Sequence, residues 1–91
     1  MISLRLLPPL TRLVGAKVIA VDMDRAPLKA VLERAIAQNG KFRTAMTDQA
    51  GTLSHEYSCL VNGERYNVAD LAEIEVKDGD EIMILLPIAG G

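Results

Sequence analysis

The feature that most limits what this sequence can fold into is a run of five apolar residues near its end, Ile82 to Leu86. Successive side chains of a strand point to opposite faces of a sheet, so a strand with one wetted face alternates apolar and polar residues. This run does not alternate, and both of its faces therefore need cover. We predict a strand over residues 81–87 that lies centrally in a sheet, beside a strand at residues 2–7.

Local patterns predict the remaining strands. The segment 2–7 alternates at its start and residues 17–23 are apolar and β-branched, so the two are expected to pair antiparallel. Asn62 and Gly63 both tolerate the positive φ of a tight hairpin turn, which predicts a strand on either side of them. The predicted strands comprise residues 2–7, 17–23, 57–61, 65–68 and 81–87.

The clearest helix is predicted from Pro27 to its stop at Asn39-Gly40, where apolar residues recur at the spacing of one helix face. The stripe consists of Leu28, Val31, Leu32, Ala35 and Ile36. Pro27 suits the first helical position because its missing N–H would have no partner there, and the Asn-Gly pair after residue 38 suits the stop. Ala26 is a poor N-cap, and Asp24 is near enough to serve instead.

Three other segments are less regular. A short helix is expected over residues 10–15, and a turn or short helix over 70–73 is expected to lead into an extended piece. From residue 41 to residue 56 the periodicity fades, which predicts a turn-rich loop. Together these elements predict an α+β fold, in which a mixed sheet of about five strands curls over one main helix. We expect one domain, residues 1–91, with a flexible tail at about 87–91.

Composition argues against several partners and locations. The formal net charge is −2, and the aromatic residues are two tyrosines and one phenylalanine, so neither a basic footprint nor a stacking platform for nucleic acid is expected. One cysteine and one histidine exclude an internal disulfide and leave little for a zinc site. No apolar run approaches the roughly 20 residues that span a bilayer, and no secretory signal is evident. We expect a cytoplasmic protein without a membrane partner.

The residue patterns of a self-contained active site are missing. The sequence has no Gly-rich phosphate loop, and its serines have no base partner other than His55. Cys59 lies among apolar residues and is expected to be a buried hydrophobe, with a reactive thiol as the alternative. Asp78 and Asp80 flank Gly79 and are expected to be turn residues. We therefore expect no enzyme activity from the chain alone and no bound cofactor.

The central strand also predicts a partner surface. One long helix covers only one face of the sheet, which leaves the other face apolar and exposed, as docking surfaces often are. We assign Leu7, Leu85 and Leu86 to this surface. The alternative is that residues 42–53 fold over the same face.

The end of the chain, Ala89-Gly90-Gly91, suggests where chemistry takes place. Glycine lacks a Cβ, so a Gly-Gly end can enter a slot too narrow for other residues and leaves the terminal carbonyl carbon unhindered. The terminal carboxylate is ionised at neutral pH and is a poor electrophile until it is activated, for example as a mixed anhydride with AMP. The alternative is a frayed end without a role.

These pieces together resemble the ubiquitin-like, β-grasp sulfur carriers of the ThiS/MoaD group. The resemblance rests on residues 78–91, residues 60–64 and the helix after the second strand. Residues 6–17 resemble the short inserted helix of the MoaD branch, the small subunit of molybdopterin synthase. That branch tends to carry aromatics where this chain has leucines (Leu6, Leu7, Leu85 and Leu86), and the loop at 41–56 is long. Carriers for cysteine biosynthesis or other sulfur insertions share both departures.

The resemblance implies a mechanism centred on Gly91. An E1-like enzyme uses ATP to adenylate the Gly91 carboxylate, and a persulfide on a sulfurtransferase displaces AMP to leave a thiocarboxylate. The tail then delivers its sulfur inside the molybdopterin synthase large subunit or another sulfur-accepting enzyme. Gly90 supplies slimness, and Ala89, Ile88 and Pro87 line the entry. Alternatives are a carrier for thiamin or cysteine biosynthesis and a modifier joined to lysines of other proteins through Gly91.

Overall fold

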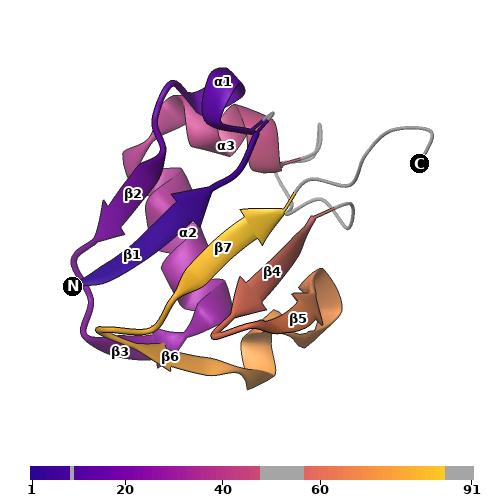
Figure 1. The fold of residues 1–91 in the computed structure, drawn as a ribbon. Coiled ribbons are helices and arrows are strands. Elements are labelled where there is room, and N and C mark those ends of the chain that lie inside the picture. Colours follow the sequence, from indigo (N-terminus) through magenta and orange to yellow (C-terminus); the bar gives the residue numbers. More distant parts are fainter. Residues whose placement is uncertain (9, 48–56, 86–91) are drawn as a thin grey trace.

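The computed structural model describes residues 1–8, 10–47 and 57–85. A mixed sheet with the order β2-β1-β7-β4-β5 forms one layer, and the helices form the other (Figure 1). The sheet strands are β1 (Ile2–Leu6), β2 (Val18–Val21), β4 (Ser58–Val61), β5 (Glu64–Asn67) and β7 (Ile82–Leu85). The helices are α1 (Leu10–Val14), α2 (Leu28–Gln38), α3 (Gly40–Met46) and the 3-10 helix η1 (Val68–Glu73). Two short strands, β3 (Arg25–Pro27) and β6 (Glu75–Lys77), pair separately.

The central strand is β7, as its lack of alternation predicted. It pairs parallel with β1, where Leu4 lies opposite Ile82, and antiparallel with β4, where Cys59 lies opposite Ile84. Ile82 and Ile84 are fully buried beneath the helices, whereas the two alternate residues of β7 are half-buried. The predicted pairing of the first and last strands is thus confirmed, although β7 ends at Leu85 within the described residues.

Helix α2 packs its apolar stripe against the inner face of the sheet (Figure 1). Four stripe residues are buried and Ile36 is half-buried, which confirms the predicted helix and its face. The prediction of its start was wrong in detail. Pro27 is the N-cap residue and no side chain caps the helix, because the Leu28 amide donates to the Ile74 carbonyl at 2.7 Å. Asp24 instead lies 3.4 Å from the Met1 ammonium.

Helix α3 falls in the segment where a turn-rich loop was expected. The Asn39 side chain accepts a hydrogen bond from the Phe42 amide at 3.0 Å, so the residue that stops α2 also caps α3. Phe42 and Met46 lie one turn apart and are both fully buried. Helix α3 packs against α1 and α2. Residues 42–46 therefore do not fold over the outer side of the sheet, and residues 48–56 lie outside the described residues.

Two turns are locked together at the start of β7. Asn62 (φ 50°) and Gly63 (φ 89°) form the predicted hairpin turn, and Asn62 Oδ1 accepts from the Glu81 amide at 3.0 Å. Asp80 accepts from the Lys77 amide at 2.8 Å and from Asn62 Nδ2 at 3.2 Å. These hydrogen bonds lower the pKa of Asp80, the Lys77 amide most strongly. Asp80 is thus a turn residue, as predicted, and it fixes where β7 begins.

We predict that Asp80→Ala lowers the free energy of unfolding by about 1 kcal/mol at neutral pH, because it removes two hydrogen bonds to a charged acceptor. The folded-state pKa of Asp80 lies below its unfolded value, so this stabilisation is present above the unfolded pKa. It is lost as the pH falls below the unfolded pKa and through the lower folded pKa. Urea unfolding at neutral and acid pH measures the difference from wild type.

The matched control is Asp22→Ala, an exposed carboxylate that makes no hydrogen bond or ion pair with a described residue. Asp22→Ala should unfold like wild type at both pH values. An Asp80→Ala deficit that persists undiminished in acid would contradict the assigned role of the carboxylate.

Candidate functional site

The sheet face turned away from α2, the outer face, carries an apolar centre between two arginines. The strand register aligns one row of side chains across the whole sheet, and cross-strand partners share a face of the sheet. That row has one residue on each of the five strands: Val18, Arg5, Met83, Leu60 and Arg65. Neither arginine forms an ion pair with a described residue. The outer face is therefore apolar in the middle and cationic on both sides.

The outer face is less exposed than the sequence predicted. Val18 is 50% exposed, but Met83 and Leu60 at its centre are half-buried. Of the residues assigned to partner binding, Leu7 and Leu85 are also half-buried, and Leu86 lies outside the described residues. The half-buried apolar centre of the outer face can still contact a partner, and the strand pairing holds its side chains in fixed positions.

The predicted partner-binding residues Leu7 and Leu85 meet at one end of the sheet. Strands β1 and β7 are parallel, and Leu6 lies opposite Ile84. The residues that follow these two, Leu7 and Leu85, therefore lie at the same end of the sheet. Helix α1 follows β1 at this end, so we call it the helix end. The chain continues past Leu85 from the helix end. The predicted tail residues Pro87, Ile88, Ala89, Gly90 and Gly91 lie outside the described residues.

Cys59 is positioned for packing and not for chemistry. It is 1% exposed on the inner side of β4, and burial raises the pKa of its thiol to about 12. The thiolate is the reactive form of cysteine, so this residue is protected from both water and reagents. The interpretation of Cys59 as a buried hydrophobe is confirmed.

We predict that a disulfide reagent at pH 8 labels the native protein more than about a hundredfold slower than it labels free cysteine, because so little thiolate is present. Labelling in urea should match the free amino acid. The course of labelling is read from the absorbance of the released thiolate. Native labelling as fast as that of free cysteine would show that Cys59 is accessible and reactive.

The described residues hold no cluster of three or more histidine, cysteine, aspartate or glutamate side chains that could bind a metal ion. His55 lies outside them. Among the helices that the structure describes, none has the length and apolar character needed to cross a membrane.

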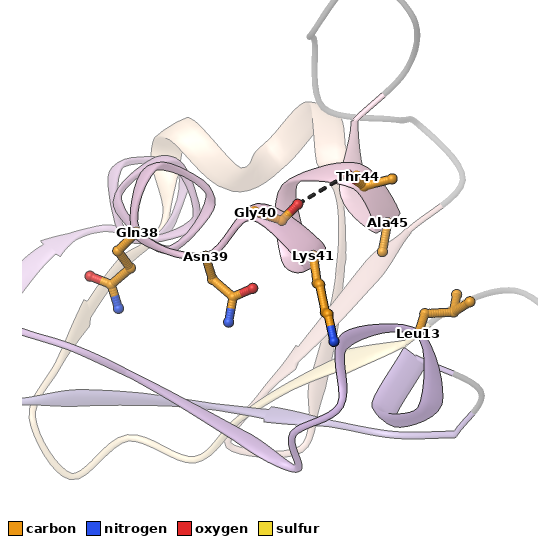
Figure 2. Close-up of a pocket in the computed structure, with 7 residues that line it drawn as sticks. All are labelled: Leu13, Gln38, Asn39, Gly40, Lys41, Thr44 and Ala45. Atoms are coloured by element: carbon orange, nitrogen blue, oxygen red, sulfur yellow. Dashed lines mark hydrogen bonds between the residues drawn. The ribbon is translucent and has the colours of Figure 1, made fainter.

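A cleft at the helix end was not predicted from the sequence. It has a volume of about 900 Å³ and lies between α1 and the junction of α2 with α3 (Figure 2). Its lining consists of Leu13, Gln38, Asn39, Gly40, Lys41, Thr44 and Ala45. Sequence reasoning missed the cleft because it depends on α3, whose only signals were the Asn39 cap and the spacing of Phe42 and Met46.

Comparisons with known proteins agree with this fold, and the match to a family model extends to the last residue. The ThiS family model matches residues 4–91. A protein of Archaeoglobus fulgidus described as a candidate sulfur carrier is 30% identical over 71 residues, which cover 78% of this chain and 81% of that protein.

Solved structures share the architecture. The crystal structure of SAMP1 from Haloferax volcanii superimposes with a TM-score of 0.79 at 24% identity, covering 98% of this chain and 97% of that one. A chain of the BexX/CysO complex from Amycolatopsis orientalis gives 0.71 at 21% identity over 100% of both chains. These similarities confirm the β-grasp fold.

Proposed function

Because the chain belongs to the ThiS family of ubiquitin-like sulfur carriers, we propose that it carries sulfur as a thiocarboxylate on its C-terminal residue, Gly91. The observation that carries the proposal is the extent of the family match, which runs through the terminal Gly-Gly to residue 91. A relative at 30% identity that is described as a candidate sulfur carrier supports the same activity.

The proposed chemistry activates an unreactive carboxylate in two steps. An oxygen of the Gly91 carboxylate attacks the α-phosphorus of ATP on an adenylating enzyme, and pyrophosphate leaves. The terminal sulfur of a persulfide on a sulfurtransferase then attacks the carbonyl carbon, and AMP leaves with the former carboxylate oxygen. A further thiol cleaves the S–S bond and is oxidised to a disulfide, which leaves the thiocarboxylate. Gly90 and Gly91 lack side chains, so they leave the carbonyl carbon open to the persulfide sulfur.

The chain's part in this chemistry is to dock and to present its tail. The outer face gives a partner an apolar centre, Met83 and Leu60, between the cations Arg5 and Arg65. A structurally similar chain is solved as part of the BexX/CysO complex, which supports a protein partner for this chain. Leu7 and Leu85 mark the end from which the tail leaves, so a partner seated on the outer face can also receive it. The adenylating enzyme and the sulfur-accepting enzyme supply the catalytic groups.

We further propose that the sulfur goes to molybdopterin, with the chain as the small subunit of molybdopterin synthase. The supporting observation is α1, which lies between β1 and β2 where the MoaD-like insertion was expected. Sulfur delivery for thiamin or cysteine biosynthesis is the alternative. A modifier role, which uses the same terminal carboxyl, is a second alternative, since a structural relative is described as a small archaeal modifier protein.

The first test is intact-mass measurement after incubation with an adenylating enzyme, ATP and a sulfurtransferase loaded with persulfide. We expect the mass gain of one sulfur-for-oxygen exchange in the full chain and no gain when Gly91 is deleted. Asp22→Ala, a change at the far end of the sheet, serves as the control and should gain sulfur like wild type. A full-length chain that is never converted would overturn the carrier function.

The second test concerns the acceptor of the sulfur. The thiocarboxylated chain, mixed with the molybdopterin synthase large subunit and its pterin substrate, should return to the carboxylate as the pterin gains sulfur. Mass spectrometry of the chain and the pterin follows both products. Sulfur transfer only to enzymes of thiamin or cysteine biosynthesis would contradict the molybdopterin assignment and favour one of those pathways. Recovery of Gly91 in isopeptide bonds to lysines would instead favour a modifier.

The third test concerns docking through the outer face. We predict that Met83→Lys raises the KM of the adenylating enzyme for the chain by about tenfold, because a third cation would stand between two arginines in place of an apolar contact. The rate of pyrophosphate release gives KM, and circular dichroism verifies the fold. Lys29→Ala, on the exposed side of α2, is the control. An unchanged KM for a folded Met83→Lys chain would show that the enzyme binds elsewhere.

A further inference from the structure

The cleft at the helix end exposes a large apolar side chain for a structural reason. Leu10 and Val14 lie one turn apart on α1 and are buried, which anchors this short helix to the core. Leu13 falls off that stripe and is 56% exposed on the cleft side. Ala45, on α3, lines the opposite wall. The anchoring of α1 therefore holds Leu13 in water, where an apolar partner side chain would cover it.

The walls of the cleft are fixed in place. The Tyr57 hydroxyl donates to the Ala45 carbonyl, which ties α3 to the segment leading into β4. Gln38 Nε2 donates to the Ala20 carbonyl at 2.7 Å, which ties the end of α2 to β2. The Gly40 carbonyl accepts from Thr44 Oγ1 at 3.0 Å, as Figure 2 shows. A partner would thus meet a cleft whose walls are already set.

Two donors in the cleft have no partner among the described residues, beside one free acceptor, Gln38 Oε1. Asn39 Oδ1 is occupied by the Phe42 amide, but Asn39 Nδ2 makes no hydrogen bond to a described residue. Lys41 forms no ion pair within the described part of the chain. Its ammonium lies close to Gly15, the residue after α1: a side chain at position 15 would place its Cβ 3.9 Å from Lys41 Nζ. A carboxylate is the group that satisfies both donors.

Among the described residues, the two ends of the sheet differ in their balance of charge. Arg12 and Lys17 border the far side of Gly15, so they continue the cationic surface that begins at Lys41. Neither pairs with a described acid. Six acids lie at the other end, around the start of β1 and β7, together with the cations Arg25 and Lys77: Asp22, Asp24, Glu75, Asp78, Asp80 and Glu81. Among the residues that the structure describes, the helix end of this chain of net charge −2 is therefore cationic.

We propose that this cleft docks an acidic segment of the adenylating enzyme, one that carries a leucine-like side chain beside a carboxylate. The inference rests on the proposed function, which brings that enzyme to the helix end to receive the tail. The apolar side chain packs on Leu13 and Ala45, and the carboxylate binds the Lys41 ammonium and Asn39 Nδ2. The cleft is thus a second contact, separate from the outer face, that steers the enzyme toward the end where the tail leaves.

The test compares adenylation kinetics of Lys41→Glu, Leu13→Ser and wild type at saturating ATP. Both side chains are exposed, so both variants are expected to fold, which circular dichroism verifies. We expect Lys41→Glu to raise KM about tenfold and Leu13→Ser several-fold, with kcat unchanged. Added salt screens the attraction of Lys41 for a carboxylate, so it should increase the wild-type KM and reduce the difference in KM between wild type and Lys41→Glu. Lys29→Glu makes the same charge change on α2 outside the cleft and should stay within about twofold of wild type.

The outcomes separate this inference from the function on which it rests. If wild type is adenylated and the cleft variants have the same KM as wild type, the docking site is overturned and the carrier function stands. Variants that change self-association, measured by sedimentation, without changing KM would overturn it in favour of a second copy of the chain. No adenylation of wild type would remove the proposed function and this inference with it. In a nitrogen-15 NMR titration with the enzyme, the amide signals of Leu13, Lys41 and Ala45 should be among the first to broaden.

Discussion

The parallel pairing of β1 with β7 is the contact on which the rest of the structure depends. It joins the first strand of the chain to the last described strand, and its inner side chains, Leu4, Leu6, Ile82 and Ile84, form the surface on which the helices pack. Because the two strands run in the same direction, both end at the helix end. The same pairing therefore closes the core and brings Leu7 next to Leu85 at the helix end.

The groups that stabilise the fold differ from those that it offers to other proteins. The one thiol, Cys59, is buried with a pKa of about 12, and the carboxylate of Asp80 is engaged in holding two turns together. Neither group is available to a substrate. What the fold offers outward is the apolar centre of the outer face, the cationic helix end and, on the proposed function, the terminal carboxyl of Gly91. The catalytic groups then belong to the proteins that bind these surfaces.

Sequence patterns predicted the elements whose cause is local. The unbroken apolar run gave the central strand, the stripe from Leu28 gave α2, and the Asn62-Gly63 pair gave the hairpin. Features that depend on distant contacts were missed. Helix α3 has only Phe42 and Met46 as anchors, and the start of α2 is capped by the Ile74 carbonyl, which no local pattern reveals. The cleft required α3 and was missed with it. The outer face was predicted as exposed and is half-buried at its centre, while the roles assigned to residues 86–91 stay predictions.

The central claim is that the reacting atoms are those of the terminal carboxyl group, and transfer of oxygen-18 tests it most directly. The chain is prepared with oxygen-18 in both oxygens of its terminal carboxylate and incubated with the adenylating enzyme, ATP and a persulfide-loaded sulfurtransferase. If the carboxylate attacks the α-phosphorus and sulfur then displaces AMP, mass spectrometry will find one oxygen-18 atom in each AMP released. Unlabelled AMP, formed while the chain retains its label, would contradict the account.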